Sequence, residues 1–595
     1  MRRATQSVTG CPSWAGLLAI AAAAFFIVAG GANLYGGWGY LDPWIYTGLI
    51  HEYGDTLARF GRTYYSTRVA AIWPQGLLYS LIGEPAYLLV RWLTLFGAGA
   101  GLALALRGLG SRWVGYFAGV ALVFFSPLLF GIMDDYTQPV AIAYALLSFA
   151  AIVQRRPAFA VASGVLAGAA IGAHEITVYL IAPLFVALAA AALPRLGIKD
   201  MARRAGLFLA GAVGIQLVLS LFMGGLYGWT RQNVLFQETA LSTAVALGKG
   251  LAANWAVSWN NDYGRIMTAV IVVLIWLLIT TYALIRRDRV VPARILGATT
   301  AMGVLMVMVL VTHFVFEASY VGTHHTIITA AVLTLSCAWL ALSVLEGDSD
   351  GPPILAGVTL VLAITFGFLV ANPAGDGKVL NLVWWGSVVA ALAAAISSLV
   401  FGKRLGGAAF RRQLAIGAML LAGIITPLAP LTTTGQAKSY YTGVQSNGAP
   451  QESLSQHLRA AKELRQVTIE VQRIVVTRVP PEVPLRFWYP YSSVAGMQHF
   501  NSIQSAFLWL SSCVLCDRVH PFPQIPAEQA AALRAGDTQV LVILAPSRSV
   551  AAEASALAGS GMLPFTQRDA PIRVSSGGLT VWVAINARPG AIPPQ

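Results

Sequence analysis

The segment GYLDPWIYTGLIHEYGDTLARFGRTYYSTRVAAIWP, from Gly39 to Pro74, follows the first apolar run of the chain and is too polar to cross a membrane itself. Between residues 44 and 60 its apolar side chains recur every three or four positions, which predicts an amphipathic helix lying in the membrane interface. The segment also holds two acids and three arginines: Asp42, Asp55, Arg59, Arg62 and Arg68. Carboxylates, guanidinium groups and aromatic rings at the lipid boundary suit a lipid-linked, phosphate-bearing substrate. An ordinary extramembrane loop is the alternative.

The composition of the whole chain indicates an integral membrane protein. Of its 595 residues, 57% are hydrophobic and 11% are charged, whereas soluble domains carry about 25% charged residues. The net charge of +14 comes from Lys and Arg in short loops between apolar runs, as the positive-inside rule requires, so we expect no nucleic-acid partner. The four cysteines exclude a disulfide scaffold and a multi-cysteine zinc site.

Apolar runs of about 20 residues predict a polytopic α-helical protein with about thirteen transmembrane helices. They cover residues 14–32, 84–106, 113–133, 139–153, 158–173, 176–193, 206–226, 266–285, 295–316, 326–345, 354–371, 380–401 and 414–431. Basic pairs such as Arg155-Arg156 and Arg286-Arg287 fall on one side when the spans alternate. This pattern places the N-terminus in the cytoplasm, and an odd number of spans places the C-terminal tail outside it.

Two domains follow from this pattern. Residues 1–431 form the transmembrane domain, with long outer loops at 33–83 and 227–264, and residues 432–595 form a soluble extracytoplasmic α/β domain. In that domain we predict helices at 452–472, 503–510 and 550–557, and strands at 484–489, 538–544 and 579–585. Cys513 and Cys516 form a CxxC motif, and we favour a local disulfide over a redox motif or half a zinc site, because the compartment is oxidising.

Polar residues gather at the outer ends of the predicted spans, which indicates one shared, membrane-embedded polar cavity. The cytoplasmic loops, in contrast, hold no P-loop and no Gly-rich nucleotide fingerprint. The outer residues are Asp42, Asp55, Arg62, Arg68, Asp134, Asp135, Tyr136, His174, Glu175, Arg231, Glu238, Lys249, Arg265, Glu317, Tyr320, His324 and His325. Each has an ordinary alternative: an acid at a helix end is often only solvated, and His174 can be a structural hydrogen-bond donor. Neighbouring residues on a helix point in different directions, so we assign no metal to the His324-His325 pair.

Three motifs resemble the GT-C integral-membrane glycosyltransferases, especially bacterial relatives of the aminoarabinose and protein mannosyl transferases. They are LDPWIYTGLI with Asp42, TYYSTRVAAIWPQGLLY with Arg68, and MDDYTQPVAIAYALL with Asp134 and Asp135. The resemblance implies a GT-C-like bundle in the bacterial inner membrane with a C-terminal periplasmic domain. In one respect the chain departs from the family: Asp42 is followed by Pro43, where many members carry a second acid. Whether Asp42 alone is the base, or shares the task with Asp134 and Asp135, is therefore open.

The resemblance implies transfer of a sugar from a polyprenyl-phosphate donor to a glycan, lipid or protein acceptor, with inversion at the anomeric carbon. An outer-loop Asp would be the general base, because a hydroxyl is a poor nucleophile until a carboxylate takes its proton. Fixed cations would stabilise the leaving phosphate; the candidates are Arg62, Arg68, Arg231 and Arg265. The remaining substrate-binding candidates are Trp44, Tyr46, Tyr136, His174, Glu175, Tyr320 and His324. No cofactor is assigned, and participation of a divalent metal is left open.

Other functions and roles compete with this interpretation. A polysaccharide polymerase or ligase would share the lipid-linked donor, but we expect its main outer loop in the second half of the bundle. A lipid or solute transporter is expected to show repeated halves, and no similarity between halves is seen. Asp42 before Pro43 is also a helix-start signal, and the loop arginines can act as interfacial anchors.

Overall fold

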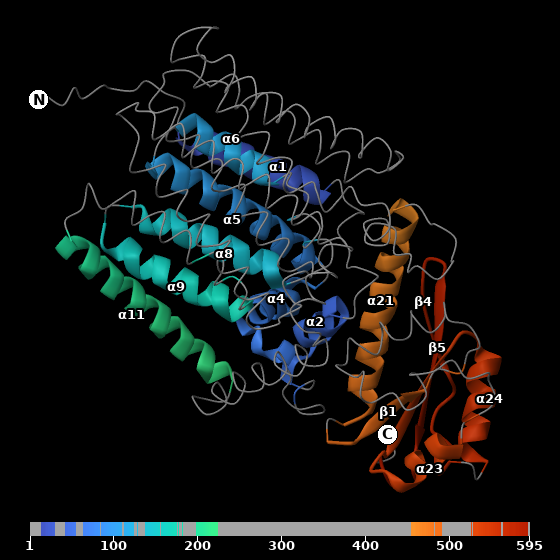
Figure 1. Ribbon diagram of the computed structural model, residues 1–595. Coiled ribbons are helices and arrows are strands. Elements are labelled where there is room, and N and C mark those ends of the chain that lie inside the picture. Colours follow the sequence, from blue (N-terminus) through green and yellow to red (C-terminus); the bar gives the residue numbers. More distant parts are fainter. Residues whose placement is uncertain are drawn as a thin grey trace, which may run out of the picture.

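The computed structural model describes two parts of the chain, a bundle of apolar helices and a C-terminal α/β domain (Figure 1). The described residues are 13–29, 42–54, 57, 64–83, 85–109, 112–123, 128, 132, 137–154, 156–174, 177, 181, 198–223, 454–480, 482–488, 490, 525, 527–560 and 563–592. The predicted span at 176–193 has only residues 177 and 181 among them, and the spans from 266 to 431, the loop at 227–264, the helix at 503–510 and the boundary at 431 lie outside them.

The helices of the bundle follow the predicted apolar runs. They are α1 (Ser13–Ala29), α5 (Pro85–Leu109), α6 (Arg112–Val123), α8 (Thr137–Ile152), α9 (Ala158–Ala173) and α11 (Ile198–Phe222). Within the described part, Pro85–Arg107 and Lys199–Leu221 are long and apolar enough to cross a membrane, and the other apolar helices are shorter.

Helix α11 begins at Ile198 rather than at the predicted Gly206, so Arg203 and Arg204 lie in the helix and not in a loop. The guanidinium of Arg204 explains the difference. It donates hydrogen bonds to the carbonyls of Gln154, at 2.6 Å, and Ile152, at 3.3 Å, at the end of α8. The last carbonyls of a helix have no partner within it, and a basic side chain satisfies them.

Helices α8, α9 and α11 pack side by side (Figure 1). Small residues bring the backbones of α9 and α11 into contact: a Cβ atom added at Gly164 would lie 1.9 Å from the Phe208 carbonyl oxygen. Close approach through glycine is a common way to pair helices where lipid offers no hydrophobic driving force. Between α8 and α9, the hydroxyls of Ser148 and Ser163 lie 2.9 Å apart.

The first outer loop differs from the prediction of one interfacial helix over 44–60. It contains α2 (Asp42–His51), the 3₁₀ helix η1 (Tyr64–Thr67) and α4 (Val69–Ile82). Residues 46–50 are all buried, so α2 is enclosed by protein and does not lie on the membrane surface. The reason is that α4 packs on α2 from within the loop and α21 covers it from the C-terminal domain.

The C-terminal domain confirms the predicted α/β class and the three predicted strands. Its elements are α21 (Leu454–Arg478), β1 (Leu485–Trp488), α23 (Ala527–Ala535), β2 (Val540–Ala545), α24 (Arg548–Gly559), β3 (Thr566–Gln567), β4 (Ile572–Ser576) and β5 (Leu579–Ala587). The sheet has the order β1-β2-β5-β3, and β4 also pairs with β5. Strands β1 and β2 are parallel, and the other pairs are antiparallel.

Strand β2 lies at the centre of this domain because both of its faces are covered. Val540, Val542 and Leu544 belong to a core cluster with residues of α21, and Leu541 and Ile543 belong to a second cluster with α23 and α24. An unbroken apolar run is typical of a strand buried on both faces. The result is three layers, with α21 on one face of the sheet and the two shorter helices on the other (Figure 1).

Helix α21 also connects the domain to the first outer loop. The side-chain amide of Gln472 donates a hydrogen bond of 3.1 Å to the Gly48 carbonyl of α2. This bond joins two segments that lie more than 400 residues apart in the chain.

Candidate functional site

Arg68 is the largest fully buried side chain among the described residues, with 1% of its surface exposed. It directly precedes α4. Its carbonyl accepts hydrogen bonds from the N–H groups of Ala71, at 3.0 Å, and Ile72, at 3.1 Å, in the first turn of that helix. The backbone at Arg68 is therefore fixed by α4, and its side chain extends into the protein.

Two hydroxyl groups orient the Arg68 guanidinium. Its Nη1 atom donates to the Tyr46 hydroxyl of α2 and, at 3.4 Å, to Thr137 Oγ1 at the start of α8. The guanidinium carbon lies 5.4 Å from the centre of the Tyr46 ring, within the range of a cation–π interaction. The hydroxyls and the aromatic face fix the direction of the Arg68 guanidinium.

Aromatic side chains brace the backbone around Arg68. The Tyr46 ring meets the Tyr65 ring edge-on at 5.8 Å, and the Tyr53 hydroxyl donates to the Ser66 carbonyl at 3.0 Å. From α8, the Tyr144 hydroxyl donates to the Ala70 carbonyl at 3.4 Å. Side chains of α2, of the residues just after it and of α8 therefore contact the segment from Tyr65 to Arg68 and the start of α4.

A second polar and aromatic cluster lies at the other end of α2. The His51 ring stacks on Tyr79 at 3.8 Å, and its Nε2 atom lies 2.9 Å from the Tyr87 hydroxyl of α5. Ile50, Gln75, Tyr79, Ala86, Tyr87 and Val90 line a small hollow beside it. This cluster ties α2 to α4 and α5.

The structure brings together only some of the residues that the sequence predicted for the site. Tyr46 and Arg68 are in direct contact. His174 is 2% exposed and ends α9; the residue before it, Ala173, belongs to the same core cluster as Val69, Ala70 and Ala71. The His174 backbone N–H donates to the Ala170 carbonyl, and the His174 carbonyl accepts from Thr177.

The other predicted residues are placed less fully. Asp42 is the first residue of α2, one position earlier than the helix-start signal predicts, and Trp44 follows in the same helix; only their backbones are described. The remaining predicted residues lie outside the described part of the chain: Arg62, Asp134, Asp135, Tyr136, Glu175, Arg231, Arg265, Tyr320, His324, Cys513 and Cys516.

Several polar residues in or against the helix bundle were not predicted from the sequence, and they are neutral or sit within apolar helices. Thr137 and Gln138 begin α8 and are almost fully buried. Arg91 lies within α5 and is 4% exposed, and a charged residue inside a predicted span is a signal that sequence reading can use. No comparable signal marks His51 or Gln472, whose partners are 36 and 424 positions away.

The described residues contain no group of three or more His, Cys, Asp or Glu side chains that could hold a metal ion. What they supply instead is a fixed cation beside tyrosine and threonine hydroxyls. Arginine's planar fork of N–H donors matches phosphate and carboxylate oxygens. The arrangement is therefore suited to binding an oxyanion where α2, α4 and α8 meet.

Comparison with known proteins gives likenesses among solved structures only. No family model matches the chain, and no curated protein matches it in sequence. ArnT from Cupriavidus metallidurans bound to undecaprenyl phosphate shares 15% identity, with 98% of this chain and 100% of that chain covered and a TM-score of 0.42.

Two further structures complete the comparison. The apo state of the same ArnT has a TM-score of 0.39 at 15% identity, with 97% of this chain and 98% of that chain covered. The archaeal oligosaccharyltransferase AglB from Archaeoglobus fulgidus, in complex with an inhibitory peptide and a dolichol-phosphate, has a TM-score of 0.33 at 10% identity, with 89% of this chain and 69% of that chain covered. These scores carry no argument about chemistry, which rests on the residues themselves.

Proposed function

We propose that this chain is a membrane glycosyltransferase that moves a sugar from a polyprenyl-phosphate donor to a glycan, lipid or protein acceptor outside the cytoplasm. The observation that carries the proposal is the buried Arg68 guanidinium, oriented by Tyr46 and Thr137 within a bundle of apolar helices. Arginine's planar fork of N–H donors matches phosphate oxygens. A lipid phosphate that enters from the bilayer is an anion that such a cation can reach.

In the proposed reaction the bond between the sugar's anomeric carbon and the phosphate oxygen breaks. The acceptor oxygen forms the new bond from the opposite face, and its proton passes to a carboxylate of the protein. The leaving polyprenyl phosphate gains negative charge as the bond breaks, so a fixed guanidinium stabilises the transition state more than the ground state. Arg62, Arg231 and Arg265 are proposed to assist Arg68.

We propose Asp42 as the base. Support comes from its place in α2, where residue 42 is one helical turn before Tyr46, and positions four apart lie on one side of a helix. Asp134 and Asp135 are the alternatives. They precede Thr137, which accepts the hydrogen bond from Arg68, by only a few residues. Both sets of acids are thus linked through the chain to groups that touch the same guanidinium.

We propose a bacterial inner-membrane location, which the resemblance implies. The charge pattern of the loops supports a cytoplasmic N-terminus and an extracytoplasmic C-terminal domain. The contact between α2 and α21 supports one part of this proposal, because the first outer loop and the C-terminal domain must then lie on the same side of the membrane. Mass spectrometry of lipids and envelope glycans from a deletion strain identifies the sugar and the acceptor.

The test of the proposal is lipid-phosphate binding by the purified full chain in nanodiscs. Undecaprenyl phosphate is the probe, with binding followed by tryptophan fluorescence. Arg68→Ala is expected to weaken binding roughly ten- to 100-fold, because hydrogen bonds to charged groups contribute about 1.5–3 kcal/mol. Arg68→Lys is expected to restore part of the loss, since lysine keeps the charge but lacks the planar fork.

The matched control is Arg478→Ala, which removes an arginine that pairs with Asp569 inside the C-terminal domain, at 2.8 Å. This variant is expected to bind the lipid as the wild type does. Equal binding by wild type and Arg68→Ala would remove Arg68 from the donor site and leave it a structural role. Absence of binding by the wild type would contradict the proposed donor class.

A further inference from the structure

Gln472 makes an unusual contact between the C-terminal domain and the first outer loop. Its side chain is 1% exposed, and its Nε2 atom donates to the Gly48 carbonyl of α2 at 3.1 Å. That carbonyl already accepts the helical hydrogen bond from the Glu52 N–H at 3.0 Å. Both acceptor sites of the Gly48 oxygen are thus used, one by α2 itself and one by a residue of another domain.

Helix α2 needs such support. It has 10 residues, and isolated helices shorter than about 12–15 residues are marginal in water. Its position is therefore decided by what packs against it: α4 and η1 within the loop, and α21 from the C-terminal domain. Two residues before Gly48, Tyr46 accepts the hydrogen bond from Arg68. A shift of α2 relative to α21 would move the Tyr46 hydroxyl that orients the guanidinium.

We propose that Gln472 is a positioning residue through which the C-terminal domain sets the geometry of the donor site. The path is short and continuous: Gln472 holds the Gly48 carbonyl, Gly48 and Tyr46 share α2, and Tyr46 holds Arg68. This inference rests on the proposed function, in which Arg68 binds the lipid phosphate. It assigns to the C-terminal domain a part in donor binding, although its sheet lies beyond α21 from the loop (Figure 1).

The chemistry of the Gln472 side chain indicates that it does more than pack the two surfaces together. Among the described residues its Oε1 atom is buried and has no hydrogen-bond partner. A buried acceptor without a partner opposes folding by about as much as an ordinary hydrogen bond contributes. An apolar side chain of equal volume would join the two surfaces at least as firmly. What the amide adds is a directed bond to one carbonyl of α2.

The experiment compares Gln472→Met with the wild type as full chains in nanodiscs. Methionine has a similar length and volume but neither donor nor acceptor, so the folded protein is expected to be as stable as the wild type. Two quantities are measured: undecaprenyl phosphate binding, and hydrogen exchange of the backbone amides at 42–51. Loss of one directed bond is expected to weaken lipid binding roughly two- to tenfold and to speed exchange in α2.

Gln466→Met is the matched control. Gln466 lies on the same helix, is exposed, and accepts a hydrogen bond from Ser576 of the C-terminal domain rather than bonding to α2. Gln466→Met is expected to leave both undecaprenyl phosphate binding and hydrogen exchange in α2 unchanged. Gln472→Glu, which keeps the shape but turns the donor into an acceptor facing a carbonyl, is expected to weaken binding more than Gln472→Met. Gln472→Leu replaces Gln472→Met if that variant does not reach the membrane.

The outcomes separate this inference from the proposed function. If the wild type binds the lipid, and Gln472→Met matches it in affinity and in exchange of α2, the positioning role is overturned while the donor site stands. If the wild type binds no lipid, the proposed function fails. Exchange in α2 then decides whether Gln472 holds the helix at all, and unchanged exchange in Gln472→Met would overturn that role too.

Discussion

The pairing of α9 with α11 and the junction of α2, α4 and α21 hold helices together in opposite ways. Between α9 and α11, glycines bring backbone against backbone, and Gln216 donates a hydrogen bond of 2.8 Å to the Gly168 carbonyl. At the junction, side chains meet through directed bonds: Arg68 to Tyr46, Gln472 to Gly48, and His51 to Tyr87. The closest contacts between α9 and α11 are backbone to backbone, whereas the junction depends on bonds made by particular side-chain atoms.

Because of this difference, a substitution should have a different effect in each region. An added methyl group between α9 and α11 displaces main chain, which cannot move without disturbing the whole helix pair. An isosteric change at the junction keeps the packing and removes only a bond or a charge. We therefore expect loss of folding from the first and loss of function in a folded protein from the second.

The largest effect is expected for Gly164→Ala. Its Cβ atom would lie 1.9 Å from the Phe208 carbonyl oxygen of α11, so the two helices must separate. We expect a destabilisation of more than about 3 kcal/mol, at or beyond the upper end for overpacked cores, and a sharp fall in the yield of folded, monodisperse protein in size-exclusion chromatography.

Gly214→Ala on α11 is the matched control, because no atom of the described residues lies within 4 Å of its added Cβ. Alanine in a helix interior is more favourable than glycine by about 0.5–1 kcal/mol, so this variant should melt at the same temperature or slightly higher. Similar yields for the two variants would mean that backbone contact does not hold α9 to α11.

At the junction, Asp42→Asn tests function without altering the fold. Asparagine starts a helix about as well as aspartate, but it cannot accept the proton of the acceptor hydroxyl. The expected result is normal insertion and normal lipid-phosphate binding, with transfer reduced about 100-fold or more, the scale of a lost general base. Turnover is measured with the donor and acceptor found in the deletion strain.

Retained transfer in Asp42→Asn would move the base to Asp134 or Asp135, and the same substitution would then be made at each of them. Loss of insertion instead would show that Asp42 acts in folding, and the two regions would then differ less than we infer.

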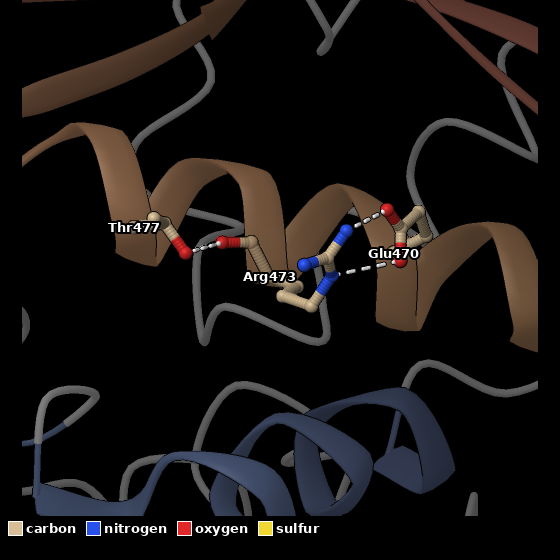
Figure 2. A network of polar contacts seen from close by, with 3 residues as sticks. All are labelled: Glu470, Arg473 and Thr477. Carbon is tan, nitrogen blue, oxygen red and sulfur yellow. Dashed lines mark hydrogen bonds and ion pairs between the residues drawn. The ribbon is translucent and has the colours of Figure 1, made fainter.

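The smallest effect is expected beside Gln472, at the exposed pair of Glu470 and Arg473 on α21 (Figure 2). Arg473 Nε donates to Glu470 at 3.0 Å. That hydrogen bond, together with the positive charge of Arg473, lowers the pKa of Glu470 below its usual value. The Arg473 side chain is 69% exposed, so the pair is screened by water and salt and contributes little.

Arg473→Ala should therefore bind lipid phosphate normally and melt almost as the wild type does at pH 7. The sign of the small difference is set by the lowered pKa of Glu470. Its contribution is present above the unfolded-state pKa and disappears as the pH falls through the folded-state pKa. The two melting temperatures should thus converge in acid. A large defect in lipid-phosphate binding by Arg473→Ala would show that the exposed side of α21 affects the donor site as the buried side does.

The sequence alone determined those features of this protein that depend on local patterns. Apolar runs located the described spans, including α9 with the same residues, and unbroken or alternating apolar stretches located β1, β2 and β5. The arginine and tyrosine of the candidate site were also predicted, because charged and aromatic residues stand out in a chain of this composition. Short elements with weak patterns, such as α23 and β4, were not predicted.

Only the tertiary structure decided which surfaces meet. The periodicity of the first loop predicted a helix exposed to the membrane surface, yet α2 is buried because a helix more than 400 residues later in the chain covers it. Arg68 was predicted as a cation, but not that hydroxyls 22 and 69 positions away would orient it. Threonine and glutamine carry no sign of their partners, because a hydrogen bond depends on where the fold places two atoms and not on the residues beside them in the chain.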